Sequence, residues 1–217
     1  MDRPLPIDLS TWPRRQHFEH YRRAVPCTYS MTVELDATRF AETLRRSARK
    51  TYVAQVWAIA TVVNRHEEFR TCVDEEGRPA LWPVVHPAFT VFNPDRETFA
   101  CVGVPYRADF GEFHAAASAA LAEHRGAADM FPLGPPPPNS FDVSSLPWTS
   151  FTGFHLDVAG GHDHLAPIFT LGRYVEREGQ VRLPLAVQVH HAVADGFHTA
   201  RLVAELQELL HEPTWVG

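Results

Sequence analysis

The sequence predicts an α/β fold of the α+β two-layer sandwich type, in which one β-sheet is covered by helices. Apolar runs with the alternation of strands are interspersed with runs that have the spacing of amphipathic helices. The length of 217 residues fits one core, because a single α/β domain reaches roughly 200 to 250 residues. Hydrophobic residues make up 45% and charged residues 21%, as in packed globular proteins. We therefore expect residues 1–217 to form one domain.

The first third of the chain predicts one strand and two helices. The run CTYSMTVEL, residues 27–35, roughly alternates and is rich in β-branched and aromatic residues, which favours a strand. Residues 38–49 place apolar side chains at four-residue spacing, which is typical of an amphipathic helix. Residues 52–65 are so apolar that we expect a helix buried nearly all round.

The middle of the chain predicts a hairpin, further strands and a third helix. The sequence Glu76-Gly77-Arg78-Pro79 is a turn signal. Residues 109–125 return to helical spacing. The runs that we expect to be strands are ALWPVV (80–85), AFTVF (88–92) and TFACVGV (98–104).

The last third begins with a proline-rich segment. Residues 131–140, FPLGPPPPNS, contain four consecutive prolines, Pro135–Pro138, and can form neither a helix nor a strand that donates hydrogen bonds. We expect a stiff surface loop there. Strands are predicted at 150–157, 165–174 and 182–190. Residues 197–210 then place leucines along one stripe, which predicts a final amphipathic helix.

Charge and composition argue against several classes of function. The net charge of -6 gives no electrostatic reason to bind nucleic acid. No apolar run approaches the roughly 20 residues of a membrane span, and the N-terminus lacks a signal-peptide pattern. We therefore expect a soluble cytoplasmic protein with no membrane partner. The three cysteines, Cys27, Cys72 and Cys101, are widely spaced, so we expect them to be reduced and mostly buried.

The segment with the most chemical information is QVHHAVADGFH, residues 188–198, between an apolar strand and the final helix. A histidine there can act as base toward a hydroxyl, because its ordinary pKa of about 6.5 leaves it largely neutral at neutral pH. By themselves, His190 and His191 are better explained as a strand-end pair, and Asp195-Gly196 as a turn and helix cap. The complete HHxxxDG pattern in this position favours catalysis.

Five blocks of the sequence resemble the chloramphenicol acetyltransferases, members of a wider class of CoA-dependent acyltransferases that share HxxxDG. The resemblance covers nearly the entire chain and implies the CoA-dependent acyltransferase fold, a mixed β-sheet covered by helices. It also implies a homotrimer in which the catalytic histidine of one subunit faces the acceptor pocket of its neighbour. The blocks are TWPRRQHFEHYRR (11–23), VHPAFTVFNPDRETF (85–99), VSSLPWTSFTGFHLDV (143–158), LAPIFTLGRY (165–174) and QVHHAVADGFHTARL (188–202).

The resemblance implies roles for five catalytic-site residues. His191 matches the general base, whose other ring nitrogen donates to the histidine's own backbone carbonyl. Asp195 matches the motif aspartate, which pairs with an arginine matching Arg14. Ser144 matches a serine that donates to the tetrahedral oxyanion, and Thr170 a threonine that helps through bound water. Without the resemblance, Ser144 would be an ordinary loop serine and Thr170 an ordinary strand residue.

Two further sets of positions match residues that contact the substrates in the family. The acceptor set is mostly apolar, as suits a nitrophenyl ring, and the second set has rings that can pack against acetyl-CoA, the implied co-substrate. The acceptor positions are Tyr21, Val25, Cys27, Phe99, Leu156 and Ile168, and the CoA positions are Tyr52, Trp148 and Tyr174.

Three features depart from the family pattern. Ala194 stands where many members have cysteine, and His20 where relatives are often aromatic. The Pro135–Pro138 tract replaces a more varied loop near the pocket. We expect these differences to affect packing and affinity more than the type of reaction.

A cluster of His162, Asp163 and His164 raises the alternative of a metal site. No further cysteine or histidine partner at metal-ligand spacing is evident, so a solvated turn is the better explanation. We expect no metal.

These features together predict an acetyl-CoA-dependent transferase that acetylates a primary hydroxyl of chloramphenicol and so confers resistance to the drug. Transfer would be direct, in a ternary complex. One alternative is acyl transfer to another hydroxyl or thiol acceptor, as in dihydrolipoamide acyltransferase cores or condensation domains. A second alternative is a noncatalytic small-molecule binding protein of the same fold, which would bind its ligand without CoA-dependent turnover.

Overall fold

The computed structural model describes residues 3–156 and 164–217. Its strands, in chain order, are β1 (Leu5–Pro6), β2 (Thr28–Asp36), β3 (Thr71–Val73), β4 (Pro79–Leu81), β5 (His86–Asn93), β6 (Thr98–Gly103), β7 (Ser140–Leu146), β8 (Ile168–Gly172), β9 (Val175–Arg177) and β10 (Gln180–His190). The large sheet has seven strands in the order β2-β10-β8-β7-β5-β6, with β9 paired to β10 off this path. β7 runs parallel to both β5 and β8, while β10 is antiparallel to its neighbours, so the predicted mixed sheet is confirmed.

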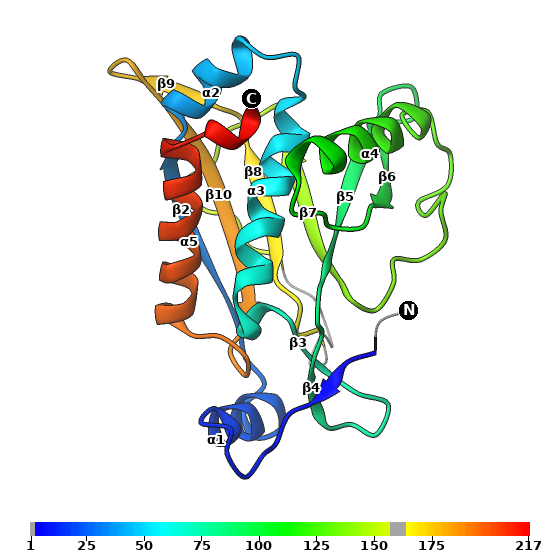
Figure 1. Ribbon diagram of the computed structural model, residues 1–217, viewed down its shortest axis with the longest axis vertical. Coiled ribbons are helices and arrows are strands. Elements are labelled where there is room, and N and C mark those ends of the chain that lie inside the picture. The colour runs from blue at the N-terminus through cyan, green and yellow to red at the C-terminus, as the bar shows by residue number, and fades with distance from the viewer. Residues whose placement is uncertain (1–2, 157–163) are drawn as a thin grey trace.

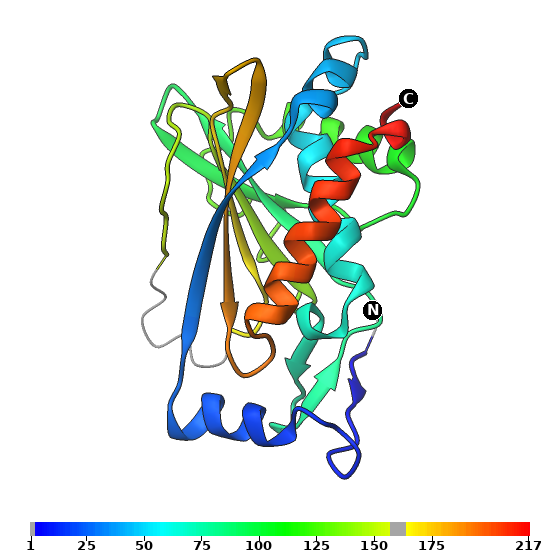
Figure 2. The same ribbon diagram turned by 90° about the vertical axis from the view of Figure 1, so that its left-hand side faces the viewer.

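Helices cover one face of this sheet, as Figure 2 shows. The helical elements are α1 (Arg15–Glu19), the π-helical turn η1 (His20–Ala24), α2 (Thr38–Arg45), α3 (Thr51–Arg65), the 3₁₀ turn η2 (Glu67–Phe69), α4 (Phe110–Glu123), α5 (Gly196–His211) and the 3₁₀ turn η3 (Thr214–Val216). A small sheet of order β1-β4-β3 lies beyond one end of the large sheet, near α1 (Figure 1). The described part of the chain contains no helix with the length and hydrophobicity that a bilayer crossing requires.

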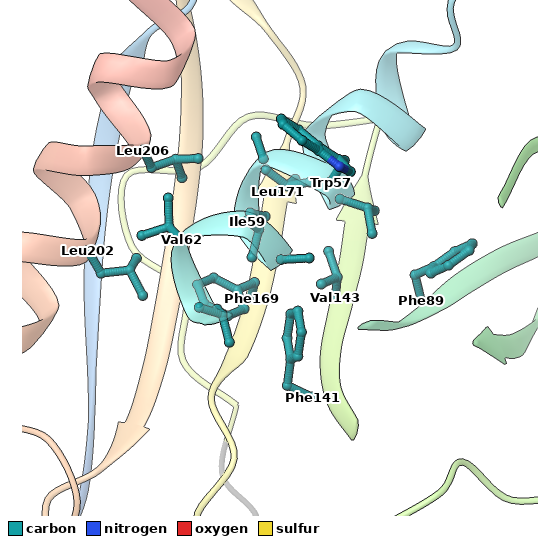
Figure 3. Close-up of a cluster of buried hydrophobic side chains, with 14 of the residues drawn as sticks. Trp57, Ile59, Val62, Phe89, Phe141, Val143, Phe169, Leu171, Leu202 and Leu206 are labelled. Carbon is teal, nitrogen blue, oxygen red and sulfur yellow. The ribbon is translucent and has the colours of Figure 1, made fainter. Parts of the chain in front are cut away.

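The core lies between the helices and the large sheet. α3 occupies the middle of the helical layer, between α5 and α4 (Figure 1), and is buried on nearly every side, as its sequence predicts. Phe89, Phe141 and Phe169, from three neighbouring strands, point toward this helix (Figure 3). Because side chains alternate along a strand, the residues directly before and after each of these phenylalanines face the other side of the sheet. That second face carries the candidate site.

One predicted strand is wrong, and the longest of the strands that were not predicted is β7; the others are the short strands β1, β3 and β9. The described part of the predicted strand at 150–157 is irregular, because its backbone bonds to side chains of the sheet: Phe154 N–H donates to Thr32 Oγ1 at 3.3 Å, and Leu156 N–H to Gln188 Oε1 at 3.3 Å. In β7 only Phe141 and Val143 are apolar residues facing the core.

Several predicted boundaries also differ. The helix expected at 38–49 ends at Arg45, because Ser47 donates from both its N–H and its Oγ to the Leu44 carbonyl and closes the last turn. The strand expected at 80–85 ends at Leu81, two residues before Pro83. All three cysteines are free and partly buried.

Candidate active site

The two motif histidines differ in their surroundings at the end of β10. His190 is buried, with 1% of its surface exposed, and its Nδ1 accepts the Ala192 N–H at 3.1 Å. His191 is the first residue after the strand and is partly exposed. The burial of His190 therefore makes it an internal residue, and the partly exposed His191 is the candidate base.

Aromatic rings and the main chain hold the His191 ring. The Tyr21 ring stacks on it with centroids 4.0 Å apart, and Tyr29 meets it edge-on at 5.4 Å. The Tyr29 hydroxyl lies 2.7 Å from Thr199 Oγ1. His191 N–H donates to the Cys27 carbonyl at 2.8 Å. These contacts limit rotation of the ring, as a base with a defined direction of attack requires.

A backbone hydrogen bond selects the tautomer of His191. Nδ1 lies 3.1 Å from the Ala194 carbonyl oxygen, which can only accept, so Nδ1 carries a proton. In the neutral ring, Nε2 is then left with a lone pair. The expectation that Nδ1 donates to the carbonyl of His191 itself is wrong, because Nδ1 faces the Ala194 carbonyl instead. The His191 carbonyl accepts from Arg14 Nη2 at 2.9 Å.

Arg14 and Asp195 form the predicted pair and hold the segment after β10. Arg14 Nη1 lies 3.0 Å from Asp195 Oδ2, and Arg14 Nε donates to the Ala192 carbonyl at 3.0 Å. Burial alone would raise the pKa of Asp195, but the hydrogen bond from Arg14 and the neighbouring charge of His198 outweigh it and lower this pKa to about 2. Asp195 is therefore ionised at neutral pH.

Ser144 and Thr170 are adjacent on the parallel strands β7 and β8. They are direct partners in the register, and their hydroxyl oxygens are 3.1 Å apart. Neighbouring Ser145 is instead paired with Leu171. Thr170 is only 3% exposed, whereas Ser144 is partly exposed. The structure thus brings together the two hydroxyls that the sequence singled out.

Ser144 lines a cavity of about 1060 Å³ on the face of the sheet away from the helices. Of the six predicted acceptor positions, Phe99, Leu156 and Ile168 line it as well. Three prolines of the predicted loop, Pro136–Pro138, form part of its wall, so this loop borders the cavity. The volume and the mostly apolar wall suit a small aromatic molecule.

The other three predicted acceptor positions lie elsewhere. Tyr21 stacks on His191, and the Cys27 carbonyl accepts the backbone N–H of His191. Val25 lies on the same segment as these two residues and is 51% exposed. None of these three residues, nor His191, is among the described residues that line the cavity. Within one chain, the predicted site is therefore divided into a histidine group and a cavity group.

The predicted CoA positions are divided between the cavity and the core. Trp148 is 57% exposed, lines the cavity and contacts Phe92 edge-on at 4.6 Å. Tyr52 packs against the core and its hydroxyl donates to the Val143 carbonyl at 3.1 Å, while burial raises its pKa to about 12. The Tyr174 hydroxyl accepts from Gln55 at 3.0 Å, and burial raises its pKa as well.

Two polar residues of the cavity wall were missed as site residues. His164 Nε2 lies 3.6 Å from Asp142 Oδ2, and both residues line the cavity. Burial raises the pKa of Asp142, and the charge of His164 acts in the opposite direction. The available signal was the position of Asp142, two residues before Ser144 and so on the same face of the strand.

The histidine-rich loop shows no metal cluster within the described part of the chain. No group of three histidine, cysteine, aspartate or glutamate side chains there is placed to hold a metal ion. His162 and Asp163 lie outside the described residues, and His164 contacts Asp142.

The chain is similar to known proteins over nearly all of its length. Residues 5–207 match the family model described as chloramphenicol acetyltransferase. A chloramphenicol acetyltransferase of Streptomyces acrimycini is 71% identical over 213 residues, which are 98% of this chain and 97% of that protein. The chain belongs to the chloramphenicol acetyltransferase family. A second family member, from Vibrio anguillarum, is 45% identical over 94% of this chain and 93% of its own length.

Solved structures share the chloramphenicol acetyltransferase fold at lower identity. A chloramphenicol acetyltransferase structure aligns with a TM-score of 0.78 at 21% identity, covering 97% of this chain and 100% of that one. A dihydrolipoamide acetyltransferase of Azotobacter vinelandii aligns with a TM-score of 0.65 at 19% identity, covering 93% and 88%. At these identities the likeness shows the shared fold alone.

The positions that depart from the chloramphenicol acetyltransferase pattern surround the site. Ala194 is fully buried, and its carbonyl is the acceptor for His191 Nδ1. His20 is exposed and meets the ring of Tyr21 edge-on at 4.8 Å. His20 therefore touches the ring that stacks on His191.

Proposed function

We propose that this protein transfers the acetyl group of acetyl-CoA to a primary hydroxyl of chloramphenicol. Family membership over nearly the whole chain supports the reaction and the acceptor. The observation that carries the chemistry is the hydrogen bond between His191 Nδ1 and the Ala194 carbonyl. It directs the lone pair of the neutral ring to Nε2, which is the atom that a base needs.

In the proposed reaction His191 Nε2 takes the proton of the acceptor hydroxyl. The hydroxyl oxygen attacks the thioester carbonyl of acetyl-CoA, and a C–O bond forms as the carbonyl oxygen becomes negative. Collapse of this intermediate breaks the C–S bond, and the proton held by His191 passes to the departing thiolate. The products are the acetyl ester and free CoA, and the base is regenerated.

The negative oxygen of the intermediate needs a donor, and we propose Ser144 for this role. Its hydroxyl lines the cavity, and Thr170 Oγ1 lies 3.1 Å from it. Hydroxyls aimed at a developing oxyanion in a water-poor site stabilise it strongly, because little reorganisation is needed as the charge appears. Thr170 is proposed to assist through a bound water.

We also propose that the active enzyme is a homotrimer in which residues 1–217 of each subunit form one domain. The division of the site supports this, because His191 and the cavity do not meet within one chain in the described residues. A closed ring would place the histidine group of one subunit over the cavity of the next. It would also cover the exposed edge of β2, the terminal strand of the large sheet.

Release of the CoA thiol, followed with a thiol-reactive chromophore, tests the reaction. Wild-type protein should release thiol only when both acetyl-CoA and chloramphenicol are present. His191→Ala should slow release by about 100- to 10,000-fold, the usual contribution of a general base. His211→Ala, at the exposed far end of α5, is the matched control and should leave the rate unchanged.

Two outcomes would reject the proposal: no chloramphenicol-dependent release by the wild type, or full release by His191→Ala. Binding of chloramphenicol without turnover would instead favour a noncatalytic binding protein. Growth of a drug-sensitive host on chloramphenicol, with and without the gene, tests the proposed resistance.

A further inference from the structure

A row of five charged or ionisable side chains leads away from the candidate base toward the surface of α5. Arg14 contacts Asp195 at 3.0 Å, and Asp195 Oδ1 lies 2.8 Å from His198 Nδ1. His198 Nε2 lies 3.3 Å from Glu68 Oε1, and Glu68 Oε2 is 3.1 Å from Arg201 Nη2. The row joins the N-terminal segment, the loop after β10, η2 and α5.

His198 fixes the orientation of the Asp195 carboxylate. Asp195 is the N-cap of α5, and His198 is the third residue of that helix. His198 Nδ1 lies 3.2 Å from the Asp195 backbone nitrogen and 2.8 Å from Asp195 Oδ1, and when Nδ1 carries a proton it donates to this carboxylate oxygen. Oδ1 accepts the Phe197 N–H at 3.1 Å and faces His198 Nδ1, which leaves Oδ2 for Arg14. Both oxygens are therefore held, and the carboxylate cannot turn without losing one of these contacts.

The orientation of Asp195 affects the position of the His191 main chain through Arg14. The guanidinium of Arg14 uses its other donors on the carbonyls of His191 and Ala192, at 2.9 and 3.0 Å. Because the guanidinium is planar and rigid, a shift of one of its three acceptors moves it relative to the other two. A rotated Asp195 would thus pull Arg14 away from the main chain that carries the His191 ring.

We propose that His198 is a positioning residue for the acetyl transfer, with Glu68 as its support. The inference rests on the proposed function and extends it to residues outside the site described above. His198 is not among the described residues that line the cavity and has no ring contact with His191. Its effect is on the placement of the base, so it should change kcat and leave the KM for either substrate nearly unchanged.

Two amide substitutions separate the two contacts of His198. Counted in bonds from Cβ, the amide nitrogen of asparagine takes the place of Nδ1, and that of glutamine the place of Nε2. His198→Asn therefore keeps the donor to Asp195, whereas His198→Gln keeps only the contact to Glu68. We expect kcat to fall about tenfold in His198→Gln and less than about twofold in His198→Asn, since small misplacements cost up to about 100-fold.

A second ion cluster on α5 supplies the control for Glu68. Glu205 binds Arg65 at 3.0 Å and His66 at 2.7 Å, with 23% of its side chain exposed against 22% for Glu68. No contact joins this cluster to Asp195 among the described interactions of Asp195. Glu68→Gln should lower kcat about threefold, whereas Glu205→Gln should not, although each variant removes the negative charge that faces one arginine and one histidine.

The NMR signal of the His191 Nδ1–H proton, recorded on protein with isotope-labelled histidine, gives a readout that needs no turnover. It should persist in His198→Asn and Glu205→Gln, and should broaden by exchange with water in His198→Gln. Equal kcat and equal signals in His198→Asn and His198→Gln, with melting temperatures matched, would overturn the inference. Absence of acetyl transfer in the wild type would reject the proposed function, and the signal would still decide the role of His198.

Discussion

Asp195 shows how a single ion pair ties the candidate site to stability. Its pKa in the folded protein is about 2, below the ordinary aspartate value of about 3.9. A carboxyl whose pKa is lowered by folding stabilises the fold above its unfolded pKa, and this contribution is lost as the pH falls through the folded pKa. The relevant window therefore runs from about pH 4 down to about pH 2.

We expect Asp195→Asn to melt below the wild type at pH 7, because Arg14 loses its charged partner. The difference in melting temperature should be constant above about pH 4 and should shrink as the pH approaches 2. Thermal unfolding monitored by circular dichroism at several pH values measures it. A difference that grows on acidification would contradict the assignment.

The paired hydroxyls of β7 and β8 allow a test within two adjacent residues. Ser144→Ala should lower kcat by about 100- to 1000-fold, the usual loss when one oxyanion donor is removed. Ser145→Ala removes the same group one residue later, where the register partner is Leu171 rather than Thr170, and should change kcat far less. Steady-state thiol release compares the two, and equal losses would reject Ser144 as the donor.

Among the elements, those with a clear apolar period were predicted well. The helices α3, α4 and α5 and the strands β2, β5, β6 and β10 all lie where apolar spacing placed them. β7 was missed because its residues on the cavity face, Ser140, Asp142 and Ser144, are polar. The false strand at 150–157 arose because its phenylalanines pack locally, with Phe151 and Phe154 rings 5.6 Å apart, rather than in a sheet.

The end of β8 offers a test of packing at the scale of an element. A Cβ on Gly172 would lie 3.0 Å from Phe151 Cε1 and 3.0 Å from Pro184 Cβ, closer than carbon atoms normally approach. Gly172→Ala should therefore reduce the free energy of unfolding by about 1 to 3 kcal/mol, the usual cost of overpacking. Urea unfolding curves measure this change.

Gly126, just after α4, is the matched control, since a Cβ there would meet no atom within 4 Å. Gly126→Ala should be neutral or slightly stabilising. A Gly172→Ala protein as stable as Gly126→Ala would show that the strand end adapts freely.

At the scale of the whole molecule, the divided site predicts complementation between subunits. His191→Ala and Ser144→Ala subunits, unfolded together in equal amounts and refolded, should recover activity that neither variant has. Each site would draw its histidine and its serine from different subunits, so random mixing in a closed ring restores about one quarter of the sites. Gel filtration measures the assembly, and thiol release measures the sites.

A mixing control accompanies this experiment. The separately refolded variants, mixed without denaturant, should stay inactive until subunits exchange. If the mixed and refolded protein stays inactive while forming the expected oligomer, each site must lie within one subunit.

The sequence by itself determined the fold class and the family, and it named the residues that we propose to carry the chemistry. Periodic apolar spacing and the HHxxxDG pattern are local features, and they persist whatever the rest of the chain does. Only the tertiary structure decided which carbonyl holds His191 Nδ1, how His198 and Glu68 extend the Arg14–Asp195 pair, and which predicted residues share a cavity. The row of charged side chains and the cavity depend on contacts between segments more than 100 residues apart, such as Arg14 with Asp195, and no local pattern specifies the geometry of such contacts.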